Sequence, residues 1–197
     1  MKNKIFLAII LLSSVYSLYA LDNSTHDPNQ MMSELSRTNQ YGMMVLGTWG
    51  VSNLIAGSIL SFGEPSPKKY FWQMNAAWNT VNITIAAIGY FGAEKDWSTI
   101  SEFINITESY KRAFLFNAGL DVGYIMTGFY LKELANRYTN HSMRLTGYGN
   151  SLILQGGFLF VFDIVKYAIH HNYFKINISP WLDTLTLANG FTLTYTF

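Results

Sequence analysis

Four long apolar stretches separated by polar connectors constrain this chain more than any other feature of its sequence. They are residues 43–62, 71–93, 113–131 and 151–169. Each is close to the ~20 residues that a helix needs to cross the hydrocarbon core of a bilayer. The charged residues inside them are Asp121, Asp163 and Lys166. Because a soluble bundle needs a charged outer face on every helix, the sequence predicts an all-α membrane protein with a four-helix transmembrane bundle.

The overall composition agrees with a membrane protein and excludes several other classes. Only 13% of the residues are charged, against roughly 25% in an ordinary soluble domain. The net charge of +1 leaves no basic surplus for nucleic acid phosphates, so nucleic acid is excluded as a partner. The absence of cysteine excludes disulfides and thiolate metal sites.

The N-terminal residues 1–20 have the pattern of an export signal. Lys2 and Lys4 precede an apolar stretch that ends at Leu12, and a more polar segment follows up to Ala20. This pattern predicts a cleaved signal peptide, with an uncleaved anchor helix as the alternative. A membrane domain over 21–175 and an exported tail over 176–197 follow from it. We expect the bacterial inner membrane as the location, with the outer membrane or a periplasm-associated state as the alternative.

Two segments outside the apolar stretches have their own patterns. In the connector 94–112, Thr99 and Glu102 form a capping box for a helix on the membrane surface; alternatively, the third helix begins early and protrudes. In the tail, apolar residues alternate with polar ones from Leu185 to Phe197 around an Asn-Gly pair. This alternation predicts a β-hairpin or strand. It is also similar to the last strand of an outer-membrane barrel, although one hairpin does not close a barrel.

Polar side chains recur on one face of each predicted helix. At 100° per residue, the polar side chains of the second stretch fall within a narrow arc of the helix. The same holds for the polar side chains of the third stretch and for those of the fourth. Polar groups facing hydrocarbon without partners cost several kcal/mol each, so we expect these faces to meet in an intramembrane polar cluster. Gly119 and Gly123 lie opposite Asp121, on a face that permits close helix contact. The predicted cluster is Asn53, Asn75, Asn79, Asn82, Asn117, Asp121, Tyr124, Gln155, Asp163 and Lys166.

Asp121 is the member of this cluster that is best placed for a chemical role. It sits near the middle of its stretch, where a carboxyl group pairs with a cation, contacts water or holds a proton. Lys166 is the only cation inside the four stretches, and Asp163 lies three residues before it. Two readings follow. Either Asp163 and Lys166 form a structural pair, or the surplus acid makes a proton or cation site with Asn117 and Gln155 as further ligands.

No pattern for catalysis, a metal or a cofactor stands out. The four histidines lack HxxxH and HExxH spacing, and no phosphate-binding loop or dinucleotide fingerprint is present. We therefore expect a binding or interaction component of the envelope, whose partners are the bilayer and a second copy of the chain or another envelope protein. A small oligomeric transporter, or a proton- or cation-conducting protein using Asp121, is the alternative. A membrane enzyme is the third reading.

Several short strings combine amides, glycines and aromatic residues. They are QMNAAWN at 73–79, LFNAGLDVGY at 115–124, GYG at 147–149, LQGGF at 154–158 and FD at 162–163. Over residues 38–171 the chain resembles an uncharacterised bacterial family of small exported proteins with four hydrophobic helices. The resemblance implies an envelope location and a helical architecture, and it supplies no catalytic residue.

Overall fold

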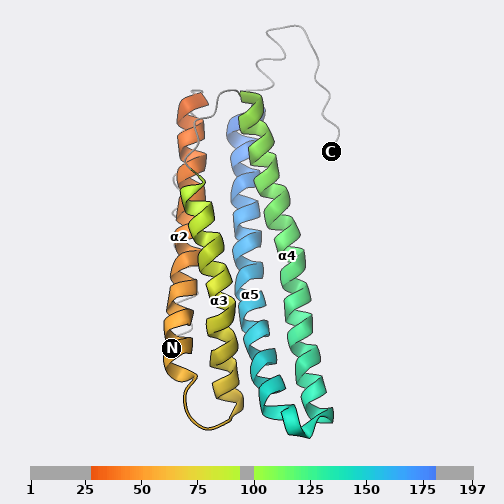
Figure 1. Ribbon diagram of the computed structural model, residues 1–197. Coiled ribbons are helices and arrows are strands. Elements are labelled where there is room, and N and C mark those ends of the chain that lie inside the picture. Colours follow the sequence, from red (N-terminus) through yellow and green to blue (C-terminus); the bar gives the residue numbers. More distant parts are fainter. Residues whose placement is uncertain (1–27, 94–99, 181–197) are drawn as a thin grey trace, which may run out of the picture.

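The computed structural model describes residues 28–93 and 100–180, and every regular element within them is helical. Four long helices lie side by side and alternate in direction (Figure 1). They are α2 (Pro28–Leu60), α3 (Pro67–Phe91), α4 (Ile100–Arg137) and α5 (Ser142–Tyr173). The short turns are η1 (Thr139–His141) and η2 (Phe174–Ile178). The all-α prediction is confirmed for this part of the chain, whereas the predicted signal peptide and β-hairpin lie outside the described residues.

Two of the four helices are long and apolar enough to cross a membrane by length and composition alone. The qualifying segments are Gln30–Leu60 and Thr139–Ile178. The core helix of a soluble protein passes the same test, as does a signal sequence near the N-terminus. This is less than the four crossings that the sequence predicts. In α3 the repeated amides, and in α4 the charged residues toward both ends, reduce the apolar character of each helix.

Local signals in the sequence define the helix boundaries. The hydroxyl of Ser66 accepts a hydrogen bond from the backbone N–H of Lys69 at 3.2 Å, and Pro67 occupies the first turn of α3, where its missing N–H costs nothing. Gly63, with φ of 102°, supplies the left-handed backbone that turns the chain between α2 and α3. Helix α4 runs without interruption for 38 residues from Ile100. Of the two readings of the 94–112 connector, the structure therefore has the helix that begins early.

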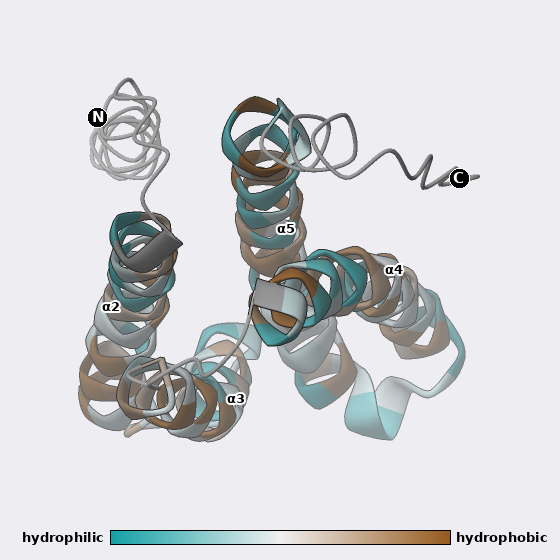
Figure 2. Cartoon of the chain, turned by 90° about the horizontal axis from the view of Figure 1, so that it is seen from above, coloured by the Kyte–Doolittle hydropathy of each residue, from teal (hydrophilic) through white to brown (hydrophobic). Residues whose placement is uncertain are grey.

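The helices pack as two antiparallel hairpins, α2 with α3 and α4 with α5, which join through a contact between α3 and α5 (Figure 2). Glycines set the closest approach between α4 and α5. A Cβ placed on Gly128 would lie 2.6 Å from the carbonyl oxygen of Gly149, and the reverse distance is also 2.6 Å. The face with Gly119 and Gly123, which permits close contact, is not used for one within the described bundle, because a Cβ on either would meet nothing within 4 Å. The face of α4 that carries Asp121 packs on α5, so the opposite face points outward.

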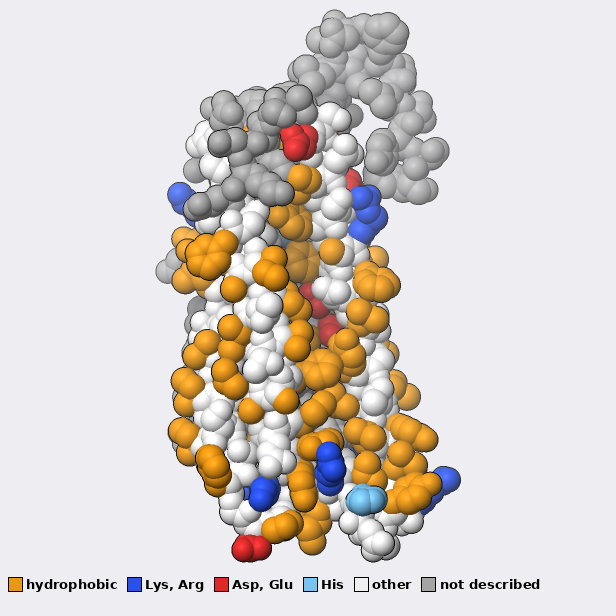
Figure 3. All heavy atoms as spheres, in the orientation of Figure 1, with side chains coloured by type: hydrophobic (Ala, Val, Ile, Leu, Met, Phe, Trp, Pro, Cys, Tyr) orange, Lys and Arg blue, Asp and Glu red, His pale blue; other side chains and the backbone are white. Residues whose placement is uncertain are grey.

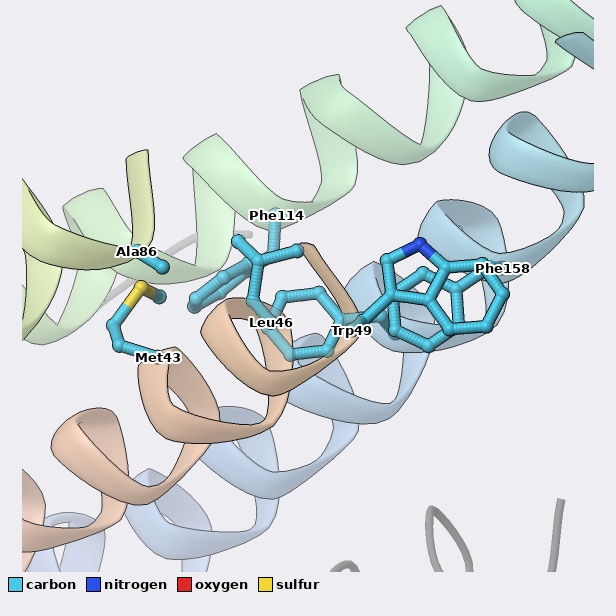
Figure 4. Packing of buried hydrophobic residues seen from close by; sticks show 7 residues of the cluster. Met43, Leu46, Trp49, Ala86, Phe114 and Phe158 are labelled. Atoms are coloured by element: carbon cyan, nitrogen blue, oxygen red, sulfur yellow. The ribbon is translucent and has the colours of Figure 1, made fainter. Parts of the chain in front are cut away.

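An aromatic core lies where the two hairpins meet. Trp49 of α2 stacks on Phe158 of α5, with ring centroids 3.9 Å apart and planes within 6° (Figure 4). The rest of this cluster is Met43, Leu46, Ala86, Phe114 and Phe162. A second apolar cluster occupies the end of the bundle where α2 begins. There the hydroxyl of Tyr173 donates to the carbonyl of Met31 at 2.7 Å, and burial together with Glu34 raises the pKa of Tyr173.

Candidate binding cleft and buried polar network

A network of amide side chains ties together α2, α3 and α5, with Asn75 at its centre. Asn75 donates to the side-chain oxygen of Asn53 at 2.7 Å. The side-chain oxygen of Asn75 accepts from Gln155 and, at 3.2 Å, from the hydroxyl of Ser151. The indole N–H of Trp49 donates to Gln155 at 2.9 Å. Hydrogen bonds to two other helices, α2 and α5, therefore converge on one fully buried side chain of α3, which fixes the rotation of each helix.

The amide network continues along α3 toward the carboxyl groups. Asn79 donates to the backbone carbonyl of Asn75 at 2.7 Å, and Asn82 donates to the side chain of Asn79 at 3.0 Å. Positions 75, 79 and 82 recur at helical spacing, so all three amides lie on the one face of α3 that is buried. Asn82 also lines the cleft described below. The amide face of α3 therefore extends from the hydrogen-bond network at Asn75 to the cleft that Asn82 lines.

Asp121 of α4 and Asp163 of α5 face each other across the contact between these helices. Their side chains are close enough to interact, and their exposed fractions are 3% and 5%. Gly156 allows the close approach, since a Cβ there would lie 2.9 Å from the backbone oxygen of Asp121. Two buried carboxyl groups side by side disfavour the state in which both are charged. Neither carboxyl group forms an ion pair with a described basic residue.

Lys166 forms no ion pair with Asp163 in the described part of the chain, so the first of the two readings, a structural pair, is not what the structure has. The ammonium group of Lys166 donates to the backbone carbonyl of Thr38 in α2 at 2.9 Å and lies 5.6 Å from the ring centroid of Phe114. The long, flexible lysine stem carries the ammonium group away from its own Cα position, here toward α2. One turn further along α5, His170 is fully buried, and neither ring nitrogen has a partner within the described part of the chain.

A cleft of about 140 Å³ lies between α3 and α4, with side chains of α2 and α5 at its base. Asp121, Asp163, Asn82, Asn117 and Tyr124 are its polar members. Figure 3 shows acidic side chains at mid-height within a surface that is otherwise largely apolar. The cleft therefore combines a small acidic centre with an apolar wall.

Two buried polar atoms in the cleft wall have no hydrogen-bond partner among the described residues. One is Oδ2 of Asp121, an acceptor, and the other is the indole N–H of Trp78, a donor. The Trp78 ring packs edge-on against Tyr124, with centroids 4.7 Å apart. Buried polar groups are nearly always satisfied. Two unsatisfied atoms of opposite type in one cavity indicate a place for a polar occupant.

The structure separates the predicted cluster into three groups. Asn53, Asn75, Asn79 and Gln155 form the amide network, the carboxyl pair and its neighbours line the cleft, and Lys166 lies with His170 nearer the end of α5. Gln155 is a partner of Asn75 and not a ligand beside Asp121. No group of three or more His, Asp or Glu side chains suited to a metal ion occurs within residues 28–93 and 100–180.

Sequence reasoning missed three residues of these sites. Trp49 and Ser151 belong to the amide network, and Trp78 lines the cleft beside the carboxyl pair. Trp78 falls near the amide face of α3, one residue before Asn79. The position of this tryptophan beside the polar face of α3 was therefore the sequence signal that could have placed Trp78 at the site. For Trp49 and Ser151 the sequence offers no equivalent signal, because their partners lie 106 and 76 residues away.

These features define an all-helical protein with a buried amide network and an acidic cleft. Residues 45–164 match a family of unknown function, DUF6992. The match covers more than half of the 197 residues, so the chain belongs to this family. The matched segment includes every residue of the amide network and both carboxyl groups of the cleft. Lys166 and His170 lie just beyond it. Comparisons with curated proteins and with solved structures found no match.

Proposed function

We propose that the protein is an integral membrane protein whose four helices cross the inner membrane of a bacterial envelope. One observation carries this proposal: the described bundle buries the charged residues of its central segments, whereas large apolar side chains are exposed on its surface. Asp121, Asp163 and Lys166, the charged residues of the four central segments, are all buried. Large apolar side chains of the same segments are exposed on every helix. Examples are Ile55, Ile88, Phe116, Met126 and Ile164.

Water favours the reverse arrangement, with charged residues outside and apolar ones within. Contiguous apolar surface of this kind marks contact with a membrane or another protein. The helices have 25 to 38 residues, which corresponds to about 38–57 Å at 1.5 Å per residue. They exceed a hydrocarbon core of about 30 Å. We propose that their ends, where the exposed charges gather, extend into the headgroups and water.

The proposed orientation places the connectors 63–70 and 132–150 in the cytoplasm. Both connectors lie at the same end of the bundle (Figure 1). Lysine and arginine counts do not choose between the two ends, since each side carries five of them. The orientation therefore depends on the predicted signal peptide over 1–20, which exports the mature N-terminus. The tail over 176–197, with its predicted hairpin, is then exported as well.

Within the membrane we propose a binding or interaction role centred on the cleft between α3 and α4. The amide side chains at Asn75 are buried and hydrogen-bonded to one another, which suits a structural role. The cleft, in contrast, has space and two polar atoms without partners. Its rim residues Val81, Ile85 and Leu120 are exposed and apolar. The proposed ligand or partner therefore approaches from the bilayer and not from the cytoplasm.

Membrane integration can be tested with single cysteines, because the chain has none of its own. We expect the full chain to stay in the membrane pellet after alkaline carbonate washing and to float with liposomes. In intact cells, a membrane-impermeant maleimide should label Ser101→Cys, while Glu64→Cys should be labelled only after the cells are opened. Val122→Cys, which is exposed on the described bundle, should stay unlabelled until detergent is added. A carbonate-soluble protein, or rapid labelling of Val122→Cys in membranes, would falsify the proposal.

A specific observation also favours a second candidate, a proton or cation pathway formed by several copies of the chain. The two carboxyl groups are buried and line the same cleft, and intramembrane carboxyl groups of this kind mark proton and ion paths. In vesicles, we expect wild-type protein to carry a proton flux that Asp121→Asn lowers at least about tenfold, a loss typical of an essential proton carrier. Glu133→Gln, at an exposed carboxyl group, is the matched control. Wild-type flux equal to that of empty vesicles rejects this candidate.

A further inference from the structure

We propose that the cleft between α3 and α4 binds a small amphiphilic amino alcohol, with its ammonium group at Asp121 and Asp163 and its apolar body against the aromatic wall. This inference deepens the binding role proposed above and specifies the chemistry of the ligand. Four observations carry it: the buried carboxyl pair, the size of the cleft, the nature of its wall and the two polar atoms without partners.

The two carboxyl groups of Asp121 and Asp163 favour a ligand with a cationic group. The pair places two carboxyl groups in one buried site, and no described lysine, arginine or histidine forms an ion pair with either of them. Lys166, the nearest buried base along α5, gives its hydrogen bond to Thr38. An unpaired charge in a buried site is costly. An ammonium ion at Oδ2 of Asp121 neutralises the pair and satisfies the atom that lacks a partner.

The size and wall of the cleft favour an organic cation over a metal ion. Its volume of about 140 Å³ is several times the roughly 30 Å³ that a water molecule occupies in the liquid, so a bare ion would leave most of it empty. Apolar side chains form most of the wall. Trp78, Tyr124 and Phe114 present aromatic rings, which attract ammonium groups through their faces. Phe162 adds a fourth ring at the base.

The indole N–H of Trp78 defines the other polar group of the ligand. It is a donor without a partner, and an ammonium ion offers no acceptor to it. A hydroxyl or ether oxygen on the same molecule accepts this bond, which makes the ligand an amino alcohol or amino ether. The exposed apolar rim at Val81, Ile85 and Leu120 accommodates an apolar body that reaches toward lipid.

The test uses the purified full chain in detergent micelles and the probe 2-amino-1-phenylethanol, followed by calorimetry and tryptophan fluorescence. We expect saturable binding, and weaker binding of phenethylamine, which lacks the hydroxyl group. Removing the amine, as in 2-phenylethanol, should weaken binding more than about tenfold, since a charge-assisted hydrogen bond contributes about 1.5–3 kcal/mol. Binding of 2-phenylethanol as tight as that of the amine, or displacement of the probe by sodium chloride but not by choline chloride, overturns the proposal.

Variants connect the binding to these residues. Asp121→Asn and Asp163→Asn should each weaken probe binding more than about tenfold, while Glu133→Gln, the exposed control, should leave it unchanged. Two acid variants keep the test decisive if one of them fails to fold, which circular dichroism shows. Trp78→Phe should retain amine binding and lose the preference for the hydroxyl group. Because binding is measured on the purified protein, its failure is distinct from a failure of membrane integration, which flotation measures.

Discussion

Asn75→Ala is expected to lower the free energy of unfolding by about 3 kcal/mol, because it removes three side-chain hydrogen bonds that join α2, α3 and α5. The substitution leaves Asn53 without its donor, and Gln155 and Ser151 without their acceptor. All of these atoms are inside the bundle, where water cannot replace the lost partner. Unfolding by sodium dodecyl sulfate in mixed micelles, followed by far-UV circular dichroism, measures the change.

Asn136→Ala is the matched control for this experiment. Asn136 is exposed near the end of α4 and makes one long hydrogen bond, 3.3 Å, to Glu133. Its replacement should change the stability by less than about 0.5 kcal/mol, as is usual for surface positions. Equal effects of the two substitutions would show that the Asn75 network contributes no more than a surface amide.

Gly128→Ala is expected to destabilise the contact between α4 and α5 by about 2 kcal/mol, the typical cost of overpacking. The added methyl group would lie 2.6 Å from the carbonyl oxygen of Gly149 and 2.7 Å from a side-chain carbon of Ile153. Backbone oxygen cannot move aside as a flexible side chain can, so the two helices must separate. A lower midpoint in the same denaturation assay, with the helix content of the native state unchanged, is the expected result.

Gly123→Ala is the control on the same helix and should have the opposite effect. A methyl group there meets nothing within 4 Å, and alanine favours a helix over glycine by about 1 kcal/mol. The variant should therefore unfold at an equal or higher detergent fraction than the wild type. If Gly123→Ala destabilised the protein as much as Gly128→Ala, the outward face of α4 would be a contact surface.

The helices and their buried faces were predictable because both follow from local periodicity. Asn75, Asn79 and Asn82 recur at helical spacing, so one face of α3 had to carry all three amides, and the structure buries that face. The same spacing placed Asp121 and Asp163 on inward faces of α4 and α5. Periodicity specifies the direction of a side chain relative to its own helix, which was sufficient for these positions.

The identity of the partners was not predictable, because it depends on how helices far apart in sequence are placed beside each other. One of the two readings paired Lys166 with Asp163, three residues away, yet its flexible stem reaches Thr38, 128 residues away. The glycine pair at 119 and 123 matched a known contact motif, while the actual contact uses Gly128 and Gly149. A motif indicates that close approach is sterically allowed, and only tertiary structure decides which face is used.

The central position of Asn75 also bears on the order in which the chain assembles. Its partner Asn53 lies earlier in the chain, whereas Gln155 and Ser151 belong to α5, the last of the long helices to be synthesised. Before α5 packs against α3, the side-chain oxygen of Asn75 lacks both of its donors. The interior face of α3 is therefore incompletely hydrogen-bonded until α5 is in place. Completion of the final helix is therefore the event that satisfies the buried polar groups of the interior.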